Sequence, residues 1–585
     1  MFSVLRKLSW FFKENWQRYA MAITLLVIVG VLDVLPPKLI GMAIDDIHVG
    51  EMSKVKLFRY IGYLFLIMVS SYGITYVWQY QLFGGAFLVE RKLRSQFMQH
   101  LLKMTPTFYE KNRTGDLMAR ATNDLKAISI TAGFGILTLA DSSLWMLTLL
   151  LTMGIFISWK LTIAAIIPLP LMAILMKYYG KRIHTRFMEA QDAFGELNDR
   201  VLESIAGVRV IRAYVQEMAD SQRFHQLTED VYKKNVEVAK IDSLFDPTIK
   251  ILVGISYLIG LGYGAYLVFH QELTLGDLVA FNVYLGMLIW PMFAVGELIN
   301  VMQRGNASLD RVNETLSYDQ DVGNPEHPVA VSTAERIDFK QVTFRYPSAQ
   351  SNNLQNVTIN LKQGQTLGIV GKTGSGKTTI IKQLLRQYPP GKGEVSIADV
   401  PLEVQTLEQV RGWIGYVPQD HVLFSRSVRE NILFGHEDAS EEELQQAIEL
   451  AAFQKDLEML PEGLATLVGE KGVALSGGQK QRISIARALI KNPEILILDD
   501  SLSAVDAKTE KQIIDNIREV RQGKTTIITT HRMSTVQHAD HIIVLEEGKI
   551  IEEGTHEQLL EQNGWYKEQF NRQQIENKWE EEVSV

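Results

Sequence analysis

The stretch "TLGIVGKTGSGKTTIIKQLL" at residues 366–385 decides the fold of the C-terminal half of the chain. Its first six residues are mostly apolar and predict a buried strand, and the "KTTIIKQLL" run predicts a helix. The segment that joins the strand to the helix has the spacing of a phosphate-binding loop, with Gly371, Gly376, Lys377 and Thr378 at the positions of that motif. Because such a loop requires a strand before it and a helix after it, an α/β phosphate-loop domain is expected here.

The residue types in this loop suit the binding of ATP. Glycines allow backbone N–H groups to converge on phosphate oxygens, and the helix N-terminus adds partial positive charge. Lys377 would neutralise the outer phosphates, and the Thr378 hydroxyl would ligate Mg²⁺. The run "ILILD" at 495–499 predicts a second buried strand, with Asp499 as a direct or indirect partner of Mg²⁺. The loop residues expected to hold ATP are Gly371, Thr373, Gly374, Ser375, Gly376, Lys377, Thr378 and Thr379.

Length and composition limit the number of domains and the kinds of site that the protein can have. The chain has 585 residues, which predicts at least two domains. It has no cysteine, which excludes disulfides, thiolate metal sites and a cysteine nucleophile. The formal net charge of −8 argues weakly against nucleic acid as a partner, and none is expected.

The first ~310 residues carry six long apolar runs, each near or beyond the ~20 residues that span a bilayer. The runs are 21–44, 61–87, 128–158, 161–177, 249–269 and 278–301. Any one of them could be a buried helix of a soluble protein, but six in one half predict a multi-pass membrane domain. The long loops after the second and fourth runs are rich in Lys and Arg, which predicts that they lie in the cytoplasm with both termini and the ATPase domain.

The basic segments outside the apolar runs also carry structural information. The start, "MFSVLRKLSWFFKENW", is too basic for a secretory signal and predicts an amphipathic helix on the inner membrane surface. The two long loops have helical periodicity, which predicts helices that continue out of the membrane. Their breaks near Gly115 and Gly207 are either simple helix caps or tips that contact a cytoplasmic domain and transmit motion.

The domain boundaries follow from these changes in pattern. We expect a transmembrane domain at 1–312 with an N-terminal interfacial helix and two coupling loops, and a linker at 313–335. A nucleotide-binding domain is expected at 336–573 and an acidic tail at 574–585.

The run "ALSGGQKQRISIARAL" at 474–489 resembles the signature of ATP-binding-cassette (ABC) proteins. Further pieces that resemble exporter half-transporters are "TGDLMAR" (114–120), "LTLGDLVAF" (273–281), "VTFRYP" (342–347), "GYVPQD" (415–420), "VGEKG" (468–472), "SAVD" (503–506) and "ITTHR" (528–532). The resemblance covers essentially the whole chain and is greatest to subunits of heterodimeric multidrug exporters of the BmrCD type. It implies a six-helix, all-α transmembrane domain of the type IV exporter class, followed by an α/β nucleotide-binding domain with a helical subdomain.

The resemblance also implies roles for individual residues. Tyr346 would stack on adenine, although a tyrosine on a strand surface is the simpler alternative. Gln419 would reach Mg²⁺ and the attacking water, and His531 would contact the γ-phosphate. The signature residues implied to hold the γ-phosphate of an ATP bound to a partner chain are Ser476, Gly477, Gly478 and Gln479. Ser503 and Asp506 would lie at the interface with that partner.

Asp500 departs from the family pattern, in which glutamate polarises the attacking water at this position. Aspartate is one methylene shorter, and a displacement of about 1 Å can reduce a rate by ~10²-fold. Either the loop adjusts and Asp500 still serves as the base, or this chain forms a degenerate site that hydrolyses ATP slowly. The intact "LSGGQ" would then complete a competent site on a second half-transporter that retains glutamate, which predicts a heterodimer.

The transported substrate is indicated only by acids within the apolar runs. Asp33, Asp141 and Glu297 would be costly in lipid, so they should face a cavity, where they would attract lipophilic cations, or else pair with another helix or an outer gate. The sequence thus predicts ATP-driven multidrug export, and with it antibiotic resistance, at the plasma membrane of a bacterium. The alternatives are a homodimeric flippase for lipid or lipid A, an ATP-gated channel or regulator, and a nonmembrane ATPase.

Overall fold

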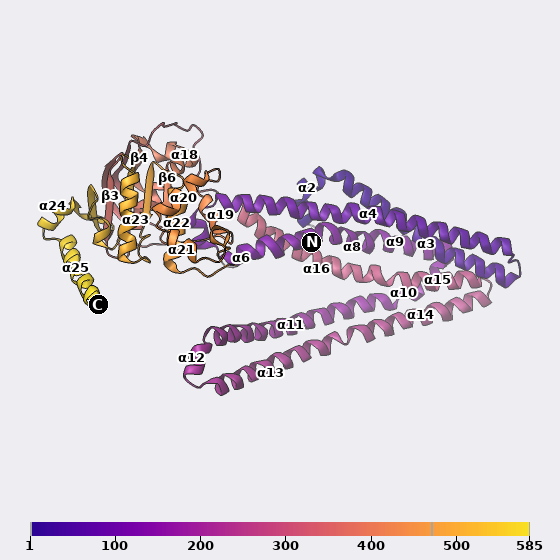
Figure 1. Cartoon of the computed structure of the whole chain (residues 1–585). Helices are drawn as coiled ribbons and strands as arrows, with labels where there is room; N and C mark the ends of the chain where they lie inside the picture. The colour runs from indigo at the N-terminus through magenta and orange to yellow at the C-terminus, as the bar shows by residue number, and fades with distance from the viewer. Residues whose placement is uncertain (1–2, 470–471, 584–585) are drawn as a thin grey trace. The chain divides into compact units, whose positions relative to one another are not determined.

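The structure is a computed structural model that describes residues 3–469 and 472–583, so Glu470 and Lys471 of the "VGEKG" motif lie outside the described residues. The chain forms two compact units (Figure 1). The first combines Met1–His100 with Gly115–Tyr318 and is helical. The second combines Leu101–Thr114 with Asp319–Val585 and contains the strands β1 to β10.

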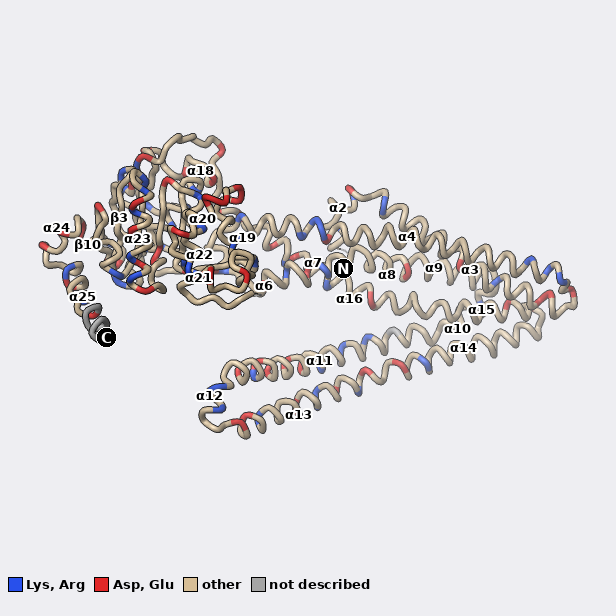
Figure 2. Tube along the Cα trace, in the orientation of Figure 1, with Lys and Arg blue, Asp and Glu red and all other residues tan. Residues whose placement is uncertain are grey.

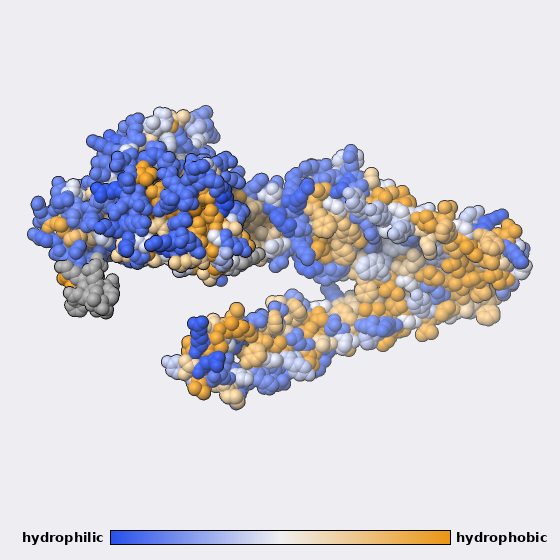
Figure 3. Space-filling model, viewed as in Figure 1, coloured by the Kyte–Doolittle hydropathy of each residue, from blue (hydrophilic) through white to orange (hydrophobic). Residues whose placement is uncertain are grey.

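Five helical stretches of the first unit are long and apolar enough to cross a membrane. They are α3 (Trp16–Val49), α4 (Lys54–Lys103), and the stretches Thr114–Ala206, Glu217–Phe269 and Leu275–Leu316. Hydrophobic residues gather on the surface of these helices, and charges are sparse along their apolar parts (Figures 2 and 3). The prediction of a helical transmembrane domain is confirmed, although the third and fourth apolar runs share one stretch.

A turn at Ser158 divides that shared stretch into two spans. The backbone of Ser158 is extended, with φ −165° and ψ 123°, and its side chain accepts a hydrogen bond from the Leu161 N–H. The Trp159 ring lies against Gly154, where a Cβ atom would come within 2.6 Å of it. The chain reverses here between α9 (Met146–Met153) and α10 (Trp159–Ile166), as Figure 1 shows. The connection is therefore a tight turn, which explains why the two runs nearly touch in the sequence.

The remaining helices of this unit form the other apolar spans and the segments that extend them. They are α6 (Thr114–Ala119), α7 (Leu125–Ile130), α8 (Ile136–Ala140), α11 (Pro168–Ala206), α12 (Val208–Ala213), α13 (Glu217–Asp242), α14 (Phe245–Phe269), α15 (Leu275–Met287) and α16 (Ile289–Leu316). Charged residues are dense along α11 to α13 (Figure 2), as expected for helices that continue beyond the bilayer.

The N-terminal segment forms two short helices, α1 (Ser3–Lys7) and α2 (Ser9–Glu14). Val4, Leu8 and Phe11 are at most 1% exposed, so the apolar face of this segment packs into the helical unit. Lys7 forms an ion pair with Asp310 of α16. The placement of this segment at the inner membrane surface stays a prediction.

The second unit contains two sheets. A four-stranded antiparallel sheet has the order β2-β1-β4-β5, and a six-stranded sheet has the order β10-β9-β3-β8-β7-β6. The strands are β1 (Arg336–Phe344), β2 (Leu354–Lys362), β3 (Thr366–Gly371), β4 (Lys392–Ile397), β5 (Val400–Pro401), β6 (Ile414–Val417), β7 (Ile495–Asp499), β8 (Thr525–Thr529), β9 (His541–Glu546) and β10 (Lys549–Gly554). In the larger sheet β3, β6, β7, β8 and β9 are parallel, so their carboxyl ends meet at one edge.

Strand β7 shows why the apolar run "ILILD" forms a central strand. All five of its residues are buried. Leu496 and Leu498 belong to the core on one face of the sheet, and Ile495 and Ile497 to the core on the other. A parallel strand covered on both faces requires a continuous apolar run rather than an alternating one.

Helices surround the larger sheet. They are α17 (Lys377–Leu384), α18 (Leu407–Gly412), α19 (Val428–Leu433), α20 (Glu441–Leu450), α21 (Gln454–Met459), α22 (Gly477–Leu489), α23 (Ala507–Val520), α24 (His556–Glu561) and α25 (Trp565–Val583). Residues 428–489 supply the helical subdomain that the sequence predicted.

The tip of the first basic loop belongs to this second unit. It contains α5 (Pro106–Lys111). The Tyr388 hydroxyl donates to Glu110 at 2.6 Å, and the Thr105 hydroxyl donates to Asp321 at 2.5 Å. We call residues 101–114 the coupling segment. It contacts the sheet-containing domain, and its part in transmitting motion stays a prediction.

Candidate nucleotide-binding site

The phosphate loop connects β3 to α17 through three glycines in the left-handed region. Gly371 has φ +149°, and a Cβ atom there would lie 2.2 Å from the Leu545 carbonyl oxygen. Gly376 has φ +107°, and its Cβ would lie 2.7 Å from the Asn353 carbonyl oxygen. Gly374 has φ +83°, and a Cβ atom there would have no neighbouring atom within 4 Å. The loop is thus packed against the domain at both ends and open at its centre, which suits a phosphate chain.

Donor groups in this loop are available to phosphate. The Lys377 ammonium donates to the carbonyl oxygens of Gly371 and Lys372, at 2.8 and 3.0 Å. Burial lowers the pKa of Lys377, and the carboxylates of Asp500 and Asp499 partly oppose that shift. The Ser375 hydroxyl is buried without a hydrogen-bond partner among the described residues. A buried hydroxyl without a partner is costly, and a phosphate oxygen would satisfy it.

Asp499 lies at the carboxyl end of β7 and is fully buried. The hydroxyls of Thr378 and Thr529 donate to its Oδ1 atom at 3.0 and 2.6 Å, and the Tyr416 hydroxyl donates to Oδ2 at 3.3 Å. Two of the three residues predicted to hold Mg²⁺, Thr378 and Asp499, are therefore in direct contact. Hydroxyl and carboxylate oxygens are the hard ligands that Mg²⁺ prefers, so the residues present fit this ion.

Asp500, Gln419 and His531 come together, as the resemblance implied. His531 Nδ1 lies 2.9 Å from Asp500 Oδ1, and the Gln419 side chain donates to Asp500 Oδ2 at 3.4 Å. The Asp500 carboxylate raises the pKa of His531 above its ordinary value. Asp500 has φ +47°, a left-handed conformation in which aspartate is several-fold enriched. Both carboxylate oxygens thus contact neighbours within this chain.

The "SAVD" segment, residues 503–506, contacts the backbone of Asp500. The Ser503 hydroxyl donates to the Asp500 carbonyl oxygen at 3.1 Å. Arg532 donates to the Ser503 carbonyl oxygen at 3.1 Å. Asp506 caps α23, and its carboxylate accepts from the Thr509 N–H at 3.0 Å.

The signature residues begin helix α22. The Ser476 side chain accepts from the Gln479 N–H, and the Gln479 side chain accepts from the Ser476 N–H, which forms a capping box. A Cβ atom on Gly477 would meet only the Ala504 Cβ at 3.6 Å, and Gly478 lies beside the same segment. Among the described residues no hydrogen bond joins residues 476–479 to the phosphate loop.

Tyr346 lies beside the helix that follows the phosphate loop. Its hydroxyl donates to Thr379 Oγ1 at 3.1 Å, and its ring packs edge-on against Phe344 and Tyr388 at centroid distances of 5.0 and 4.9 Å. The Lys382 ammonium lies 5.4 Å from the ring centroid. The ring is half-buried.

The three acids in the apolar runs each have a polar partner. The Ser71 hydroxyl donates to Asp33 at 3.1 Å, between α3 and α4. The Trp290 indole N–H donates to Asp141 at 2.9 Å. Glu297 lies 3.7 Å from Arg304 on the same helix, α16. Asp33 and Asp141 therefore pair with other helices, as one of the two alternatives predicted.

Comparison with known protein families agrees with this geometry. The family model of the ABC transporter transmembrane region matches residues 19–292, and that of the ABC transporter matches residues 354–503. A Bacillus subtilis protein, the probable multidrug resistance ABC transporter ATP-binding/permease protein YheI, is 66% identical over 98% of both chains. The chain belongs to the ABC transporter family.

Two further relatives and one solved structure place the chain within that family. The multidrug resistance-like ATP-binding protein MdlA of Escherichia coli is 42% identical over 97% of this chain and 96% of its own. The ATP-dependent lipid A-core flippase of Syntrophus aciditrophicus is 31% identical over 100% of this chain and 96% of its own. A bacterial Atm1-family ABC exporter with ATP bound has a TM-score of 0.78 and 26% identity, over 95% of this chain and 99% of that one. The type IV exporter fold and the exporter ATPase predicted from the sequence are confirmed.

Proposed function

We propose that this ABC exporter moves lipophilic compounds, including several drugs, out of a bacterial cell as one half of a heterodimer. Relatives named as multidrug resistance proteins support the substrate class. The observation that carries the heterodimer is the contrast between Asp500, which replaces the expected glutamate, and an intact signature capped by Ser476.

ATP and Mg²⁺ are proposed to bind at the phosphate loop of this chain. The backbone N–H groups of residues 373–379 and the Lys377 ammonium would hold the phosphates, and Tyr346 would contact the adenine. Thr378, Gln419 and Asp499 would hold Mg²⁺, which supplies positive charge to the β- and γ-phosphates. His531 would contact the γ-phosphate of the same ATP. Ser375 gains a partner in this arrangement, which its buried, unpaired hydroxyl favours.

Asp500 is proposed to be a poor general base. Its side chain is one methylene shorter than glutamate, and its two oxygens already contact His531 and Gln419. A displacement of about 1 Å can reduce a rate by ~10²-fold. The ATP held by this chain would therefore be hydrolysed slowly and would serve mainly to keep the two nucleotide-binding domains together.

The signature of this chain is proposed to complete the competent site of its partner. Ser476 caps a helix of thirteen residues that begins at Gly477, and the N–H groups of Gly477 and Gly478 stay outside the capping box. Helix N-termini bind anions through such N–H groups and the helix dipole. Ser503 and Asp506 would lie at the same interface. The partner would be a second ABC half-transporter that retains the catalytic glutamate.

Transport would follow from the exchange of two states. ATP would contact both nucleotide-binding domains only when they are closed on each other, so ATP binding favours the closed state. In that state the membrane cavity would be open to the outside. Hydrolysis at the competent site removes the γ-phosphate and allows the domains to separate. In this account both termini and the ATPase domain lie in the cytoplasm, because the long loops are basic.

The chain purified alone should be a weak, drug-insensitive ATPase. A homodimer would carry Asp500 at both sites, so its turnover should be ~10²-fold below that of the chain co-purified with its partner. The measurement is ATP hydrolysis in lipid nanodiscs, with and without a lipophilic dye that is transported. Brisk, dye-stimulated turnover by this chain alone would contradict the heterodimer and favour a homodimeric exporter or flippase.

Glu297 offers a test of the substrate class. Its carboxylate is partly exposed and has a distant cationic partner, Arg304, so Glu297→Gln should reduce transport of a cationic dye about tenfold, or ~1.4 kcal/mol. Transport of a neutral dye should change less than about twofold. Glu314→Gln is the matched control, because Glu314 lies on the same helix outside the apolar run and pairs with Arg120. Equal losses for both dyes would assign Glu297 to gating or structure.

A further inference from the structure

Tyr416 is an aromatic residue that contacts the candidate nucleotide site from a neighbouring strand. It lies on β6, the edge strand of the larger sheet, and its Cα pairs with that of Ile497 on β7. Side chains two residues apart on a strand point to the same face and are ~6.6 Å apart along the strand. Asp499 is two residues beyond Ile497 on β7. The Tyr416 ring extends along the strand direction, and its hydroxyl reaches the Asp499 carboxylate.

The hydrogen bonds of Asp499 are divided between its two oxygens. Oδ1 accepts from Thr378 and Thr529, whereas Oδ2 accepts from the Tyr416 hydroxyl. Among the described residues, no other group donates to Oδ2. Thr378 and Thr529 alone would leave the carboxylate free to rotate about its bond to Cβ, and the third contact fixes its plane.

We propose that Tyr416 is a positioning residue that orients Asp499 for Mg²⁺. This inference rests on the proposed nucleotide site. The hydroxyl of a tyrosine can donate a hydrogen bond to a carboxylate oxygen. Mg²⁺ demands near-ideal octahedral geometry, so the orientation of a carboxylate near it affects affinity. Groups that orient metal ligands typically change metal affinity 10–100-fold when they are removed.

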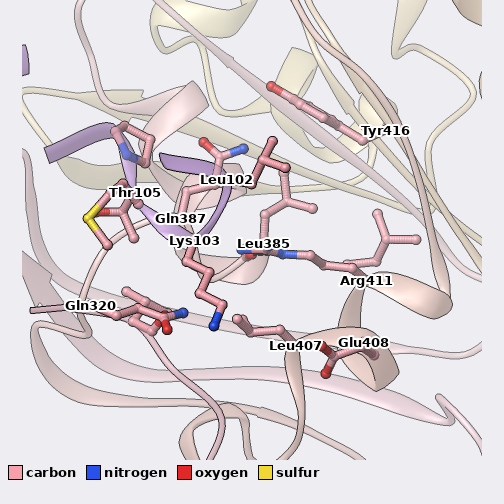
Figure 4. Close-up of a pocket in the computed structure, with 14 residues that line it drawn as sticks. Leu102, Lys103, Thr105, Gln320, Leu385, Gln387, Leu407, Glu408, Arg411 and Tyr416 are labelled. Atoms are coloured by element: carbon pink, nitrogen blue, oxygen red, sulfur yellow. Dashed lines mark hydrogen bonds between the residues drawn. The ribbon is translucent and has the colours of Figure 1, made fainter. Parts of the chain in front are cut away.

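The ring of Tyr416 also forms part of the wall of a cavity of about 690 Å³ in the same compact unit. Leu102 and Thr105 of the coupling segment line this cavity together with Gln320 of the linker and Leu385 and Arg411 of the domain, as Figure 4 shows. One side chain therefore contacts both the space that the coupling segment helps to enclose and the carboxylate at the nucleotide site.

Tyr416→Phe tests this inference because it removes the hydroxyl and keeps the ring. The full-length chain is titrated with Mg²⁺ in the presence of a fluorescent ATP analogue, and binding without metal is measured in EDTA. The Mg²⁺ concentration for half-maximal enhancement of binding should rise about tenfold. The affinity for the metal-free analogue should stay within about twofold of the unmodified chain, because the phosphate loop is intact.

Two further variants distinguish a failure of the Tyr416 inference from a failure of the proposed nucleotide site. Tyr566→Phe is the matched control, since Tyr566 is a buried tyrosine of the same unit whose hydroxyl lies 2.8 Å from His556 Nδ1, and it should not shift the Mg²⁺ dependence. Asp499→Asn should remove most of that dependence. An unchanged titration for Tyr416→Phe, or an equal loss of metal-free binding, would overturn the inference. An unchanged titration for Asp499→Asn would instead overturn the proposed site.

Discussion

Replacing Gly477 with aspartate in the assembled heterodimer is expected to reduce ATP hydrolysis at saturating ATP by at least ~10²-fold. The new carboxylate would meet the γ-phosphate of the ATP bound to the partner, and like charges at such an interface cost several kcal/mol. Every 1.4 kcal/mol is a tenfold change, so this effect should dominate the kinetics. The chain itself should fold, because a Cβ at Gly477 meets only Ala504 and an acidic residue is favourable in a first helical turn.

Two other variants of the same domain give this prediction its controls. Asp500→Asn should leave most of the activity, because we propose that Asp500 belongs to the slow site. Gly412→Asp places the same charge on an exposed helical glycine whose Cβ would meet nothing within 4 Å, and it should have no effect. If Asp500→Asn stops turnover and Gly477→Asp leaves it largely intact, the assignment of the two sites is reversed.

The phosphate-loop pattern is visible in the sequence because its residues are fixed by local geometry. Gly371 and Gly376 have no room for a Cβ, and β7 is buried on both faces. Such constraints leave a pattern of glycines and apolar residues that is visible within twenty residues. The contact between Thr378 and Asp499 then follows, because parallel strands bring their carboxyl ends to one edge of the sheet.

Other features depend on contacts between distant segments and left little local signal. Tyr416 is one of several aromatic residues on strands, and only the register of β6 on β7 places it near Asp499. The bond between Glu110 and Tyr388 joins residues 278 positions apart. The turn at Ser158 is different, because the sequence already separates the apolar runs 128–158 and 161–177 at this point, and the structure places one extended residue there.

The partners of the membrane acids were predicted only as a choice between two alternatives. A carboxylate in an apolar run indicates a functional or a paired position, and the sequence does not distinguish them. The structure pairs Asp33 with Ser71 and Asp141 with Trp290, while Glu297 keeps a weaker contact with Arg304. For that reason Glu297 is the acid chosen for the transport experiment.

The central claim is that hydrolysis occurs at the partner's nucleotide and not at the one this chain holds. The heterodimer is incubated with a photoreactive, radiolabelled ATP analogue, Mg²⁺ and vanadate, which traps ADP only where hydrolysis has occurred. After cross-linking, the two polypeptides are separated, and the label on each is measured. Nearly all vanadate-dependent label should be on the partner, whose own phosphate loop holds the trapped nucleotide. Equal labelling of both chains, or labelling mainly of this chain, would contradict the central claim.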